Sequence, residues 1–163
     1  MSKAVNQLTR LFPPPLHRVG LRAAHALRHR WRLLVKARLE GVSVIAHREG
    51  GSILLVRHSY GPPVWALPGG GMSAREHPLA AAEREIREEL GCGLEMPQLV
   101  ARLEEEISGS VHVGHIVAAR LSGPPRPDRR EVMEARFFPL AEFPLDTSEL
   151  ARRRIGIWLK HRR

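Results

Sequence analysis

The sequence predicts an α/β fold in which helices pack against a mixed β-sheet. Two observations lead to this prediction. Runs rich in Val, Ile and Leu, typical of strands, occur at 41–60, 98–121 and 131–140. Segments with helical periodicity occur at 78–90 and 147–161, so strands and helices alternate along the chain. With 163 residues, the chain is long enough for one domain with a sizeable core.

The first 39 residues are expected to form a lead-in and a helix. Residues 1–15 end in Phe-Pro-Pro-Pro, a run that cannot be helical. Residues 16–39 place apolar residues at steps of three and four, which predicts an amphipathic helix with a basic opposite face. We therefore divide the chain into a lead-in at 1–15, a basic helix at 16–39 and a domain at 40–163.

The strands follow from apolar runs and turn signals. The two apolar runs within 41–60 flank Arg-Glu-Gly-Gly, which predicts a β-hairpin. Residues 61–76 contain too many Pro and Gly for regular structure and are expected to be a loop. The run at 98–121 is interrupted by Ser-Gly-Ser at 108–110, which predicts two strands joined by a turn. A Pro-rich loop at 123–130 precedes the last strand, at 131–140.

The two helices have recognisable ends. Pro78 suits the first position of a helix, and Gly91 suits the position just after its end. The second helix has Thr147 or Ser148 as its N-cap. The apolar residues of the first helix form one stripe, which we expect to face the core: Leu79, Ala82, Ile86 and Leu90.

The charge of the chain is unevenly distributed. The formal net charge of +9 divides into +8 over 1–40, −5 over 41–150 and +6 over 151–163. A single cysteine excludes an intramolecular disulfide framework. No apolar run approaches the roughly 20 residues that span a bilayer, and the N-terminus lacks the apolar segment of a secretory signal. We therefore expect a cytoplasmic protein that is not transmembrane.

Carboxylates gather on the first helix despite the basic charge of the chain. Helical geometry places Glu85, Glu88 and Glu89 within about a 100° arc, and Arg84 at its edge can neutralise only part of their charge. Clustered carboxylate oxygens suit Mg²⁺ or Mn²⁺. A solvated charged face is the alternative interpretation of the helix taken alone. Before the helix, Gly69, Gly70 and Gly71 would let the backbone approach an ion or a phosphate closely.

Spacing over a longer window decides between these interpretations. Gly70 is followed after five residues by Glu76, and after seven more by Arg84-Glu85-Ile86-x-Glu88-Glu89-x-Gly91-Cys92. This reproduces the Nudix box, G-x5-E-x7-R-E-U-x-E-E-x-G-U, in which U is a bulky apolar residue. The chain therefore resembles a Nudix hydrolase, over about 41–145.

The resemblance implies a Nudix-like α/β/α sandwich with a mixed sheet. It also implies a Mg²⁺-dependent hydrolase, for which Mn²⁺ is an alternative ion, that cleaves a diphosphate linkage in a nucleoside diphosphate derivative or nucleotide. Arg84 would orient the glutamates, and Glu76 would stabilise the turn between loop and helix. The implied metal ligands are Glu85, Glu88, Glu89 and a carbonyl of Gly69 or Gly70.

Two residues depart from the pattern of the family. Cys92 fills the final apolar position, where we expect it to pack as a small hydrophobic residue. Arg75 stands where the family commonly has glycine before the glutamate, so the conformation of the loop could differ. Neither departure removes a ligand.

The reaction also needs a group that activates water. The candidates within the box are Glu88 and Glu89. Outside it they are Glu131, at the start of the predicted last strand, and the run 104–106. For Glu131 the alternative is a surface acid on an edge strand.

The sequence contains less specific signals for the residues that recognise the substrate. Trp65 and Tyr60 flank the glycine loop and could stack on a nucleobase, although packing is an equally valid interpretation of Trp65. Arg57 and His58, at the end of a strand near the loop, could contact phosphate. Gly69 and Gly71 complete the predicted substrate contacts.

The two basic ends of the chain do not identify a single binding partner. The helix at 16–39 could pack on its own domain or on a second subunit in a homodimer, lie on an anionic membrane, bind RNA or act as a targeting segment. Two other functions therefore stand beside a small nucleotide substrate. One is an RNA 5′-pyrophosphohydrolase, and the other is a non-catalytic Nudix module that binds a nucleotide or RNA.

Overall fold

The computed structural model describes residues 39–107 and 110–162. The predicted lead-in and all but the last residue of the predicted basic helix lie outside this part of the chain. Among the described helices, none is long and apolar enough to cross a membrane.

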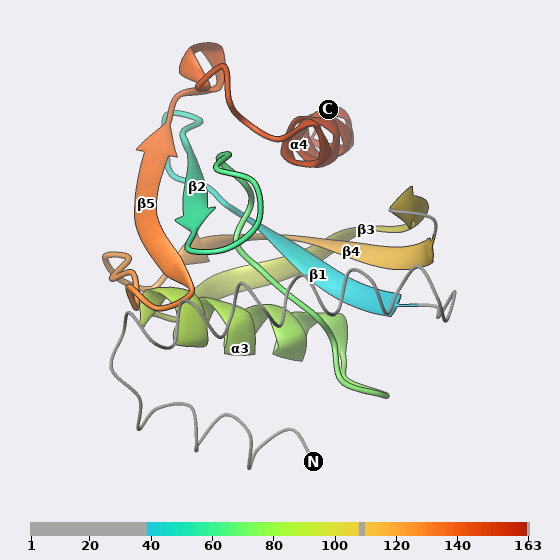
Figure 1. The fold of residues 1–163 in the computed structure, drawn as a ribbon. Coiled ribbons are helices and arrows are strands. Elements are labelled where there is room, and N and C mark those ends of the chain that lie inside the picture. The colour runs from blue at the N-terminus through green and yellow to red at the C-terminus, as the bar shows by residue number, and fades with distance from the viewer. Residues whose placement is uncertain (1–38, 108–109, 163) are drawn as a thin grey trace.

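The core of the fold is a sheet between two helices (Figure 1). Strands β1 (Leu39–Ala46), β4 (Ser110–Leu121) and β3 (Leu94–Ile107) lie in the order β1-β4-β3, with β1 parallel and β3 antiparallel to β4. Helix α3 (Pro78–Leu90) lies on one side of this sheet and α4 (Glu149–His161) on the other. This confirms the predicted α/β/α arrangement with a mixed sheet.

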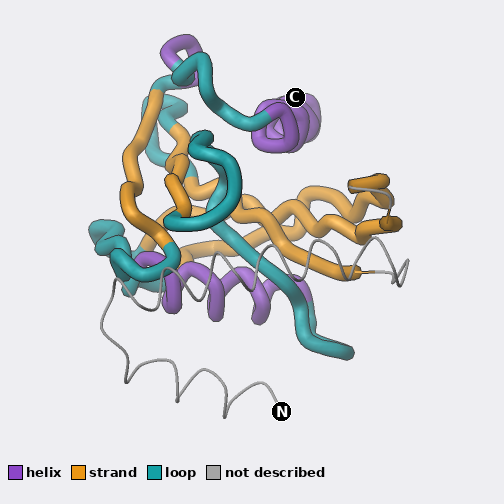
Figure 2. Tube along the Cα trace, in the orientation of Figure 1, coloured by secondary structure: helices purple, strands orange, loops and turns teal. Residues whose placement is uncertain are grey.

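The predicted hairpin over 41–60 is wrong in its pairing. Its two strands exist, but β2 (Ile53–His58) pairs antiparallel with β5 (Val132–Phe138) in a second sheet. Only an isolated bridge between His47 and Ile53 joins β1 to β2. The first four residues of β2 are completely buried, so both faces of this strand are covered, as a hairpin on the surface would not allow. Figure 2 shows the two sheets diverging.

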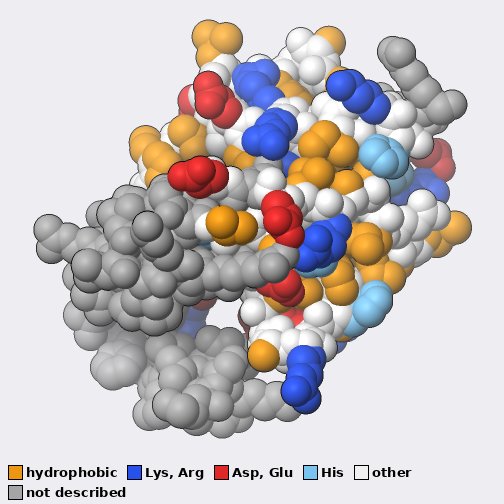
Figure 3. All heavy atoms as spheres, turned by 90° about the vertical axis from the view of Figure 1, so that its right-hand side faces the viewer, with side chains coloured by type: hydrophobic (Ala, Val, Ile, Leu, Met, Phe, Trp, Pro, Cys, Tyr) orange, Lys and Arg blue, Asp and Glu red, His pale blue; other side chains and the backbone are white. Residues whose placement is uncertain are grey.

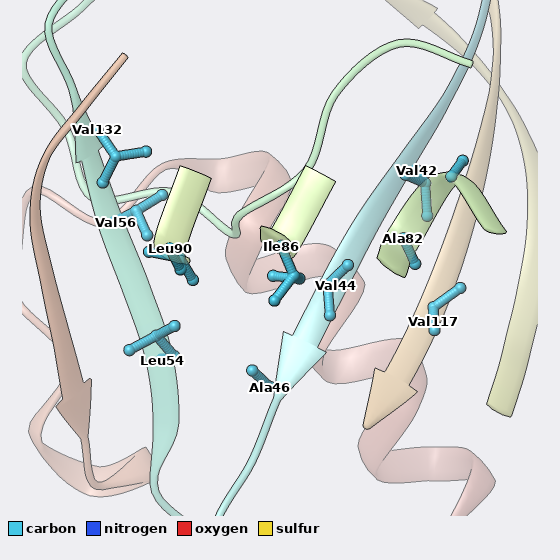
Figure 4. Close-up of a cluster of buried hydrophobic side chains, with 11 residues drawn as sticks. Val42, Val44, Ala46, Leu54, Val56, Ala82, Ile86, Leu90, Val117 and Val132 are labelled. Carbon is cyan, nitrogen blue, oxygen red and sulfur yellow. The ribbon is translucent and has the colours of Figure 1, made fainter. Parts of the chain in front are cut away.

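Two hydrophobic clusters occupy the two sides of the central sheet. On the α3 side, the predicted stripe packs on β1, β2 and β4 (Figure 4). Ala82, Ile86 and Leu90 are fully buried there, and Leu79 lies at the margin of the cluster. The cluster on the α4 side is built from the inward residues of α4, the opposite faces of the strands and Trp65 of the loop after β2: Ile45, Ile53, Leu55, Trp65, Ile116, Ala151, Ile155 and Trp158.

The predicted helix ends are confirmed. Helix α3 begins at Pro78 and is followed by Gly91, which has a left-handed φ of 63° and donates its N–H to the carbonyl of Arg87. The Ser148 hydroxyl caps α4 by accepting from the N–H of Ala151. A short 3-10 helix, η1 (Leu140–Glu142), lies between β5 and α4.

Candidate active site

The glycine loop is fixed along the edge of β1. Val42 donates its N–H to the carbonyl of Gly70 and Val44 donates to the carbonyl of Pro68, both at 2.9 Å. Gly69 has a φ of 133°, and a Cβ at this position would collide with the carbonyl of Val42. Glycine is therefore required here for the loop to pack against β1. The carbonyl of Gly70, a predicted metal ligand, keeps one lone pair beyond its bond to Val42.

Glu85 on α3 lies directly against this loop. A Cβ on Gly70 would lie 2.6 Å from Oε1 of Glu85, so the missing side chain of Gly70 makes room for the carboxylate. The side chain of Glu85 is 13% exposed. Burial raises the pKa of Glu85 above its ordinary value, and the hydrogen bond from Arg84 opposes this rise.

Glu89 is the most deeply buried acid of the site. It is 4% exposed, and its Oε2 accepts a hydrogen bond of 3.1 Å from the N–H of Gly69. Burial, followed by the charge of Glu85, raises the pKa of Glu89 well above its ordinary value. A buried carboxylate next to a second carboxylate is unfavourable unless a positive charge compensates for it. Glu88 faces solvent more openly, with 40% of its side chain exposed.

Arg84 connects the loop to the carboxylates. Its Nε and Nη2 donate to the two carboxylate oxygens of Glu76 at 2.9 and 3.0 Å, and Nη2 also reaches the carbonyl of Gly71 at 2.9 Å. Its Nη1 donates to Oε1 of Glu85 at 2.7 Å. The hydrogen bond from Arg84 lowers the pKa of Glu76. These are the contacts expected of a residue that orients a glutamate and closes the turn between loop and helix.

Glu131 is brought to the same carboxylates by a loop that docks on the end of α3. The N–H of Arg126 donates to the carbonyl of Leu90, and the N–H of Asp128 donates to the carbonyl of Glu89. The charge of Glu131 contributes to the raised pKa of both Glu85 and Glu89. By contrast, Glu104 in the other candidate run lies 3.6 Å from Arg102 on β3, where both side chains are about half exposed.

Asp128 holds this loop and was not singled out from the sequence. Its Oδ1 accepts the N–H groups of three successive residues, Arg130, Glu131 and Val132, at 2.9–3.0 Å. An aspartate that accepts backbone bonds a few residues ahead is a typical turn motif. The Pro-Asp pair before Glu131 was the available signal for it.

The predicted substrate residues are only partly brought to the site. Trp65 is 5% exposed and packs edge-on against Phe138, a placement that favours the packing interpretation over base stacking. Arg57 forms an ion pair with Asp146 and lies over the ring of Trp65. Tyr60 is half-buried beside the ring of His58. Gly71 is exposed, and a Cβ added to it would meet no atom within 4 Å.

The two departures from the box pattern are accommodated. Arg75 adopts a left-handed φ of 65°, the conformation that a glycine would take there without strain. Cys92 is half-buried against the cluster under α3, and burial raises the pKa of its thiol, as expected for a packing residue.

The donor set of the site fits a hard divalent cation. Carboxylate oxygens of two α3 glutamates and a loop carbonyl lie on adjacent surfaces, and the burial of Glu89 leaves negative charge to be compensated. Within the described residues, however, no three acid, His or Cys side chains converge tightly enough to form a closed ligand group. Arg84, bonded to Glu85 and 3.6 Å from Glu88, lies between two of the predicted ligands.

Comparison with known proteins agrees with this geometry. The family model described as NUDIX domain matches residues 37–159. Over 109 residues, the chain is 33% identical to an ADP-ribose pyrophosphatase of Mycobacterium tuberculosis, covering 62% of this chain and 53% of that protein. Over 52 residues, it is 42% identical to an RNA pyrophosphohydrolase of Halorhodospira halophila, covering 32% of this chain and 28% of that protein.

The fold has a solved counterpart. The crystal structure of a MutT NUDIX hydrolase from Burkholderia pseudomallei superimposes with a TM-score of 0.67 and 28% identity, covering 74% of this chain and 97% of that one. The chain thus spans about half, or less, of the curated relatives that it matches, and nearly all of this structural neighbour.

Proposed function

The chain belongs to the NUDIX domain family, and on this premise we propose that it is a pyrophosphohydrolase that cleaves a phosphoric anhydride linkage in a nucleoside diphosphate derivative or nucleotide. The observation that carries the proposal is the buried carboxylate of Glu89. It lies against the loop of Gly69 and interacts with Glu85 and Glu131. Fold stability alone does not favour gathering these acids, because each raises the cost of ionising the others.

The glutamates of α3 are the proposed metal ligands. Glu85, Glu88 and Glu89, with the carbonyl of Gly70, would hold Mg²⁺ or, as an alternative, Mn²⁺. When bound, the cation would supply positive charge for the phosphates and lower the pKa of water. The buried positions of Glu85 and Glu89 support this assignment, because they place carboxylate oxygens where water alone cannot compensate for their charge.

The remaining residues have positioning and proton-transfer roles in the proposal. Arg84 orients Glu85 through the bond from Nη1 and ties the glycine loop to α3. Glu131 is the proposed general base, because it reaches the carboxylates from a separate loop while its backbone is held by Asp128 and Ser59. Glu88 and Glu89 are the alternatives for that role.

A panel of substrates tests the proposal directly. ADP-ribose, nucleoside triphosphates, nucleotide sugars, dinucleotides and 5′-triphosphorylated RNA are incubated with the full chain and Mg²⁺, and the products are separated by chromatography. We expect turnover of at least one small nucleotide. The rate of this turnover should fall by about 10²-fold or more in Glu89→Gln. Glu142→Gln, an exposed change on η1, is the matched control and should keep wild-type rates.

RNA is the second candidate substrate. The match to an RNA pyrophosphohydrolase supports it, although that match covers only 32% of this chain. On the face drawn in Figure 3, the basic and acidic side chains of the described residues are interspersed, with no extended basic surface for a long polyanion there. Preferred turnover of triphosphorylated RNA would reverse this order. If no compound on the panel is hydrolysed while nucleotide still binds, the chain is a non-catalytic binding module.

A further inference from the structure

A cavity of about 530 Å³ lies where the two sheets separate. The parallel strands β1 and β4 end side by side, with Ala46 paired to Ala119. From there the chain crosses to the second sheet twice, into β2 after β1 and towards β5 after β4. The walls of the cavity come from both crossings, the end of β4, the start of β3 and β5, and include His47, Arg48, Arg120, Leu121 and Phe137. Its volume lies within the range of small-molecule sites.

This cavity is remote from the glutamates of α3. Gly41, near the start of β1, bridges Gly71 of the glycine loop, whereas His47 follows the other end of the same strand. The six residue steps of extended chain between Gly41 and His47 span about 20 Å. None of the residues that line the cavity belongs to the box at 70–92. A ligand in the cavity would therefore occupy a different site from the proposed substrate.

Two arginines, Arg48 and Arg120, line the cavity. The guanidinium carbon of Arg48 lies 3.7 Å from the ring centroid of Phe137, and no ion pair to Arg48 occurs among the described residues. Nearby, the guanidinium of Arg162 lies over the ring of Trp158, whose centroid is 5.3 Å from that of His47. Stacking on an aromatic ring fixes a guanidinium while its N–H donors at the edge stay available.

Two glutamates, Glu49 and Glu95, also line the cavity, and like Arg48 and Arg120 they are exposed. Arg120 pairs with Glu49, whose side chain is 88% exposed and so points to solvent. Burial lowers the pKa of His47, and the charges of Arg162 and Arg120 lower it further. The field at His47 is thus dominated by the arginines and not by Glu49. Glu95, the remaining acid, is exposed.

From this arrangement we infer that the cavity is a second ligand site, which takes a small phosphate-bearing anion. Arg48 and Arg120 line the cavity and would donate to such a ligand, and Leu121 and Phe137 provide apolar walls beside it. Arginine suits this role because its planar fork matches two phosphate oxygens at once. The volume admits a phosphate or diphosphate with a small organic group.

A titration with pyrophosphate tests the inference. ¹⁵N-labelled full chain is titrated in the presence of EDTA, so that no divalent cation assists binding at the glutamates. We expect saturable shifts at the backbone amides of 47–49 and 120–123, and a Kd raised about tenfold or more in Arg48→Gln. Arg136→Gln is the matched control, because Arg136 is the exposed neighbour of Phe137 on β5 and lies on the opposite face of that strand.

Three results would overturn the inference: shifts confined to the glycine loop, no saturable binding, or equal affinities of Arg48→Gln and Arg136→Gln. Thermal unfolding of each variant shows whether it is folded, and Arg120→Gln replaces Arg48→Gln if the latter is not. Failure of this experiment leaves the proposed hydrolase activity untouched, because no proposed catalytic residue lines the cavity.

Discussion

Arg84 and Glu76 form a two-pronged ion pair, with Nε and Nη2 of Arg84 at 2.9 and 3.0 Å from the two carboxylate oxygens of Glu76. The backbone N–H of Ser73 donates to the same carboxylate, at 2.8 Å. Glu76 thereby stabilises the turn between loop and helix, and Arg84 is left with Nη1 to hold Glu85. Arg84 and Glu76 thus act together to position Glu85.

Arg84→Lys should reduce kcat about 10- to 100-fold and change KM little. Lysine keeps the charge but cannot donate to Glu76, Glu85 and Gly71 at once, so Glu85 loses its fixed orientation. The free energy of unfolding should fall by only about 1 kcal/mol, because the pair is partly exposed. Steady-state kinetics and urea unfolding measure the two effects. A large rise in KM at constant kcat would contradict a positioning role.

Gly70→Ala should abolish turnover, whereas Gly71→Ala should not. A methyl group on Gly70 would lie 2.6 Å from Oε1 of Glu85 and displace the carboxylate, but at Gly71 it meets open space. Neither glycine has the positive φ that would make alanine strained. We expect a loss of at least about 10²-fold for the first variant and less than about threefold for the second. Equal activity of the two variants would exclude Glu85 as a ligand.

Glu89→Gln should be more stable than the wild type at about pH 8 in EDTA, by a few degrees in Tm. The pKa of Glu89 is raised by burial, so the folded state holds its proton more tightly than the unfolded state does. Stability from this group is therefore present below the ordinary pKa of glutamate and is lost as pH rises through the folded-state pKa. Glutamine has no charge to bury and still accepts from Gly69.

The control for this prediction is the pH dependence itself. The difference in Tm between Glu89→Gln and the wild type should disappear at a pH below the ordinary pKa of glutamate, where Glu89 is protonated in both states. Mg²⁺ should raise the Tm of the wild type more than that of the variant. A difference in Tm that is independent of pH would point to packing instead of charge.

Asp128→Ala should lower kcat about as much as Glu131→Gln does. Without the Asp128 carboxylate, the N–H groups of Arg130, Glu131 and Val132 lose their acceptor and Glu131 loses its fixed position. The cost in unfolding free energy should be about 0.5–2 kcal/mol, as for the loss of a helix cap. Asp128→Asn keeps one acceptor oxygen and should recover part of the rate. No recovery would indicate that the charge of Asp128 matters.

Arg75→Gly should stabilise the fold slightly or leave it unchanged. Arg75 has a φ of 65°, a left-handed conformation that costs a residue with a Cβ about 1–2 kcal/mol. Glycine removes this strain, but its greater freedom in the unfolded chain costs about 0.5–1 kcal/mol, so the free energy of unfolding should rise by between zero and about 1.5 kcal/mol. Urea unfolding measures it. A loss of stability would mean that the Arg75 side chain makes a compensating interaction.

Much of this protein could be predicted from local pattern. The ends of α3 follow from Pro78 and Gly91, because one has a fixed φ and the other tolerates a left-handed one. The stripe of Ile86 and Leu90 follows from helical period, and the family follows from the spacing of the box. Each of these features depends on residues that are close in sequence, whose geometry the backbone constrains directly.

Tertiary structure alone decided the features that join distant segments. The sequence could not pair β2 with β5, because residues 59–131 lie between the two strands and local pattern favours the nearest partner. Nor could it decide between packing and base stacking for Trp65, or bring Glu131 to Glu89 through the loop held by Asp128. The sequence by itself determined the kind of chemistry, since the box is local. Which acids meet, and which aromatic is buried, depended on long-range packing that no local spacing encodes.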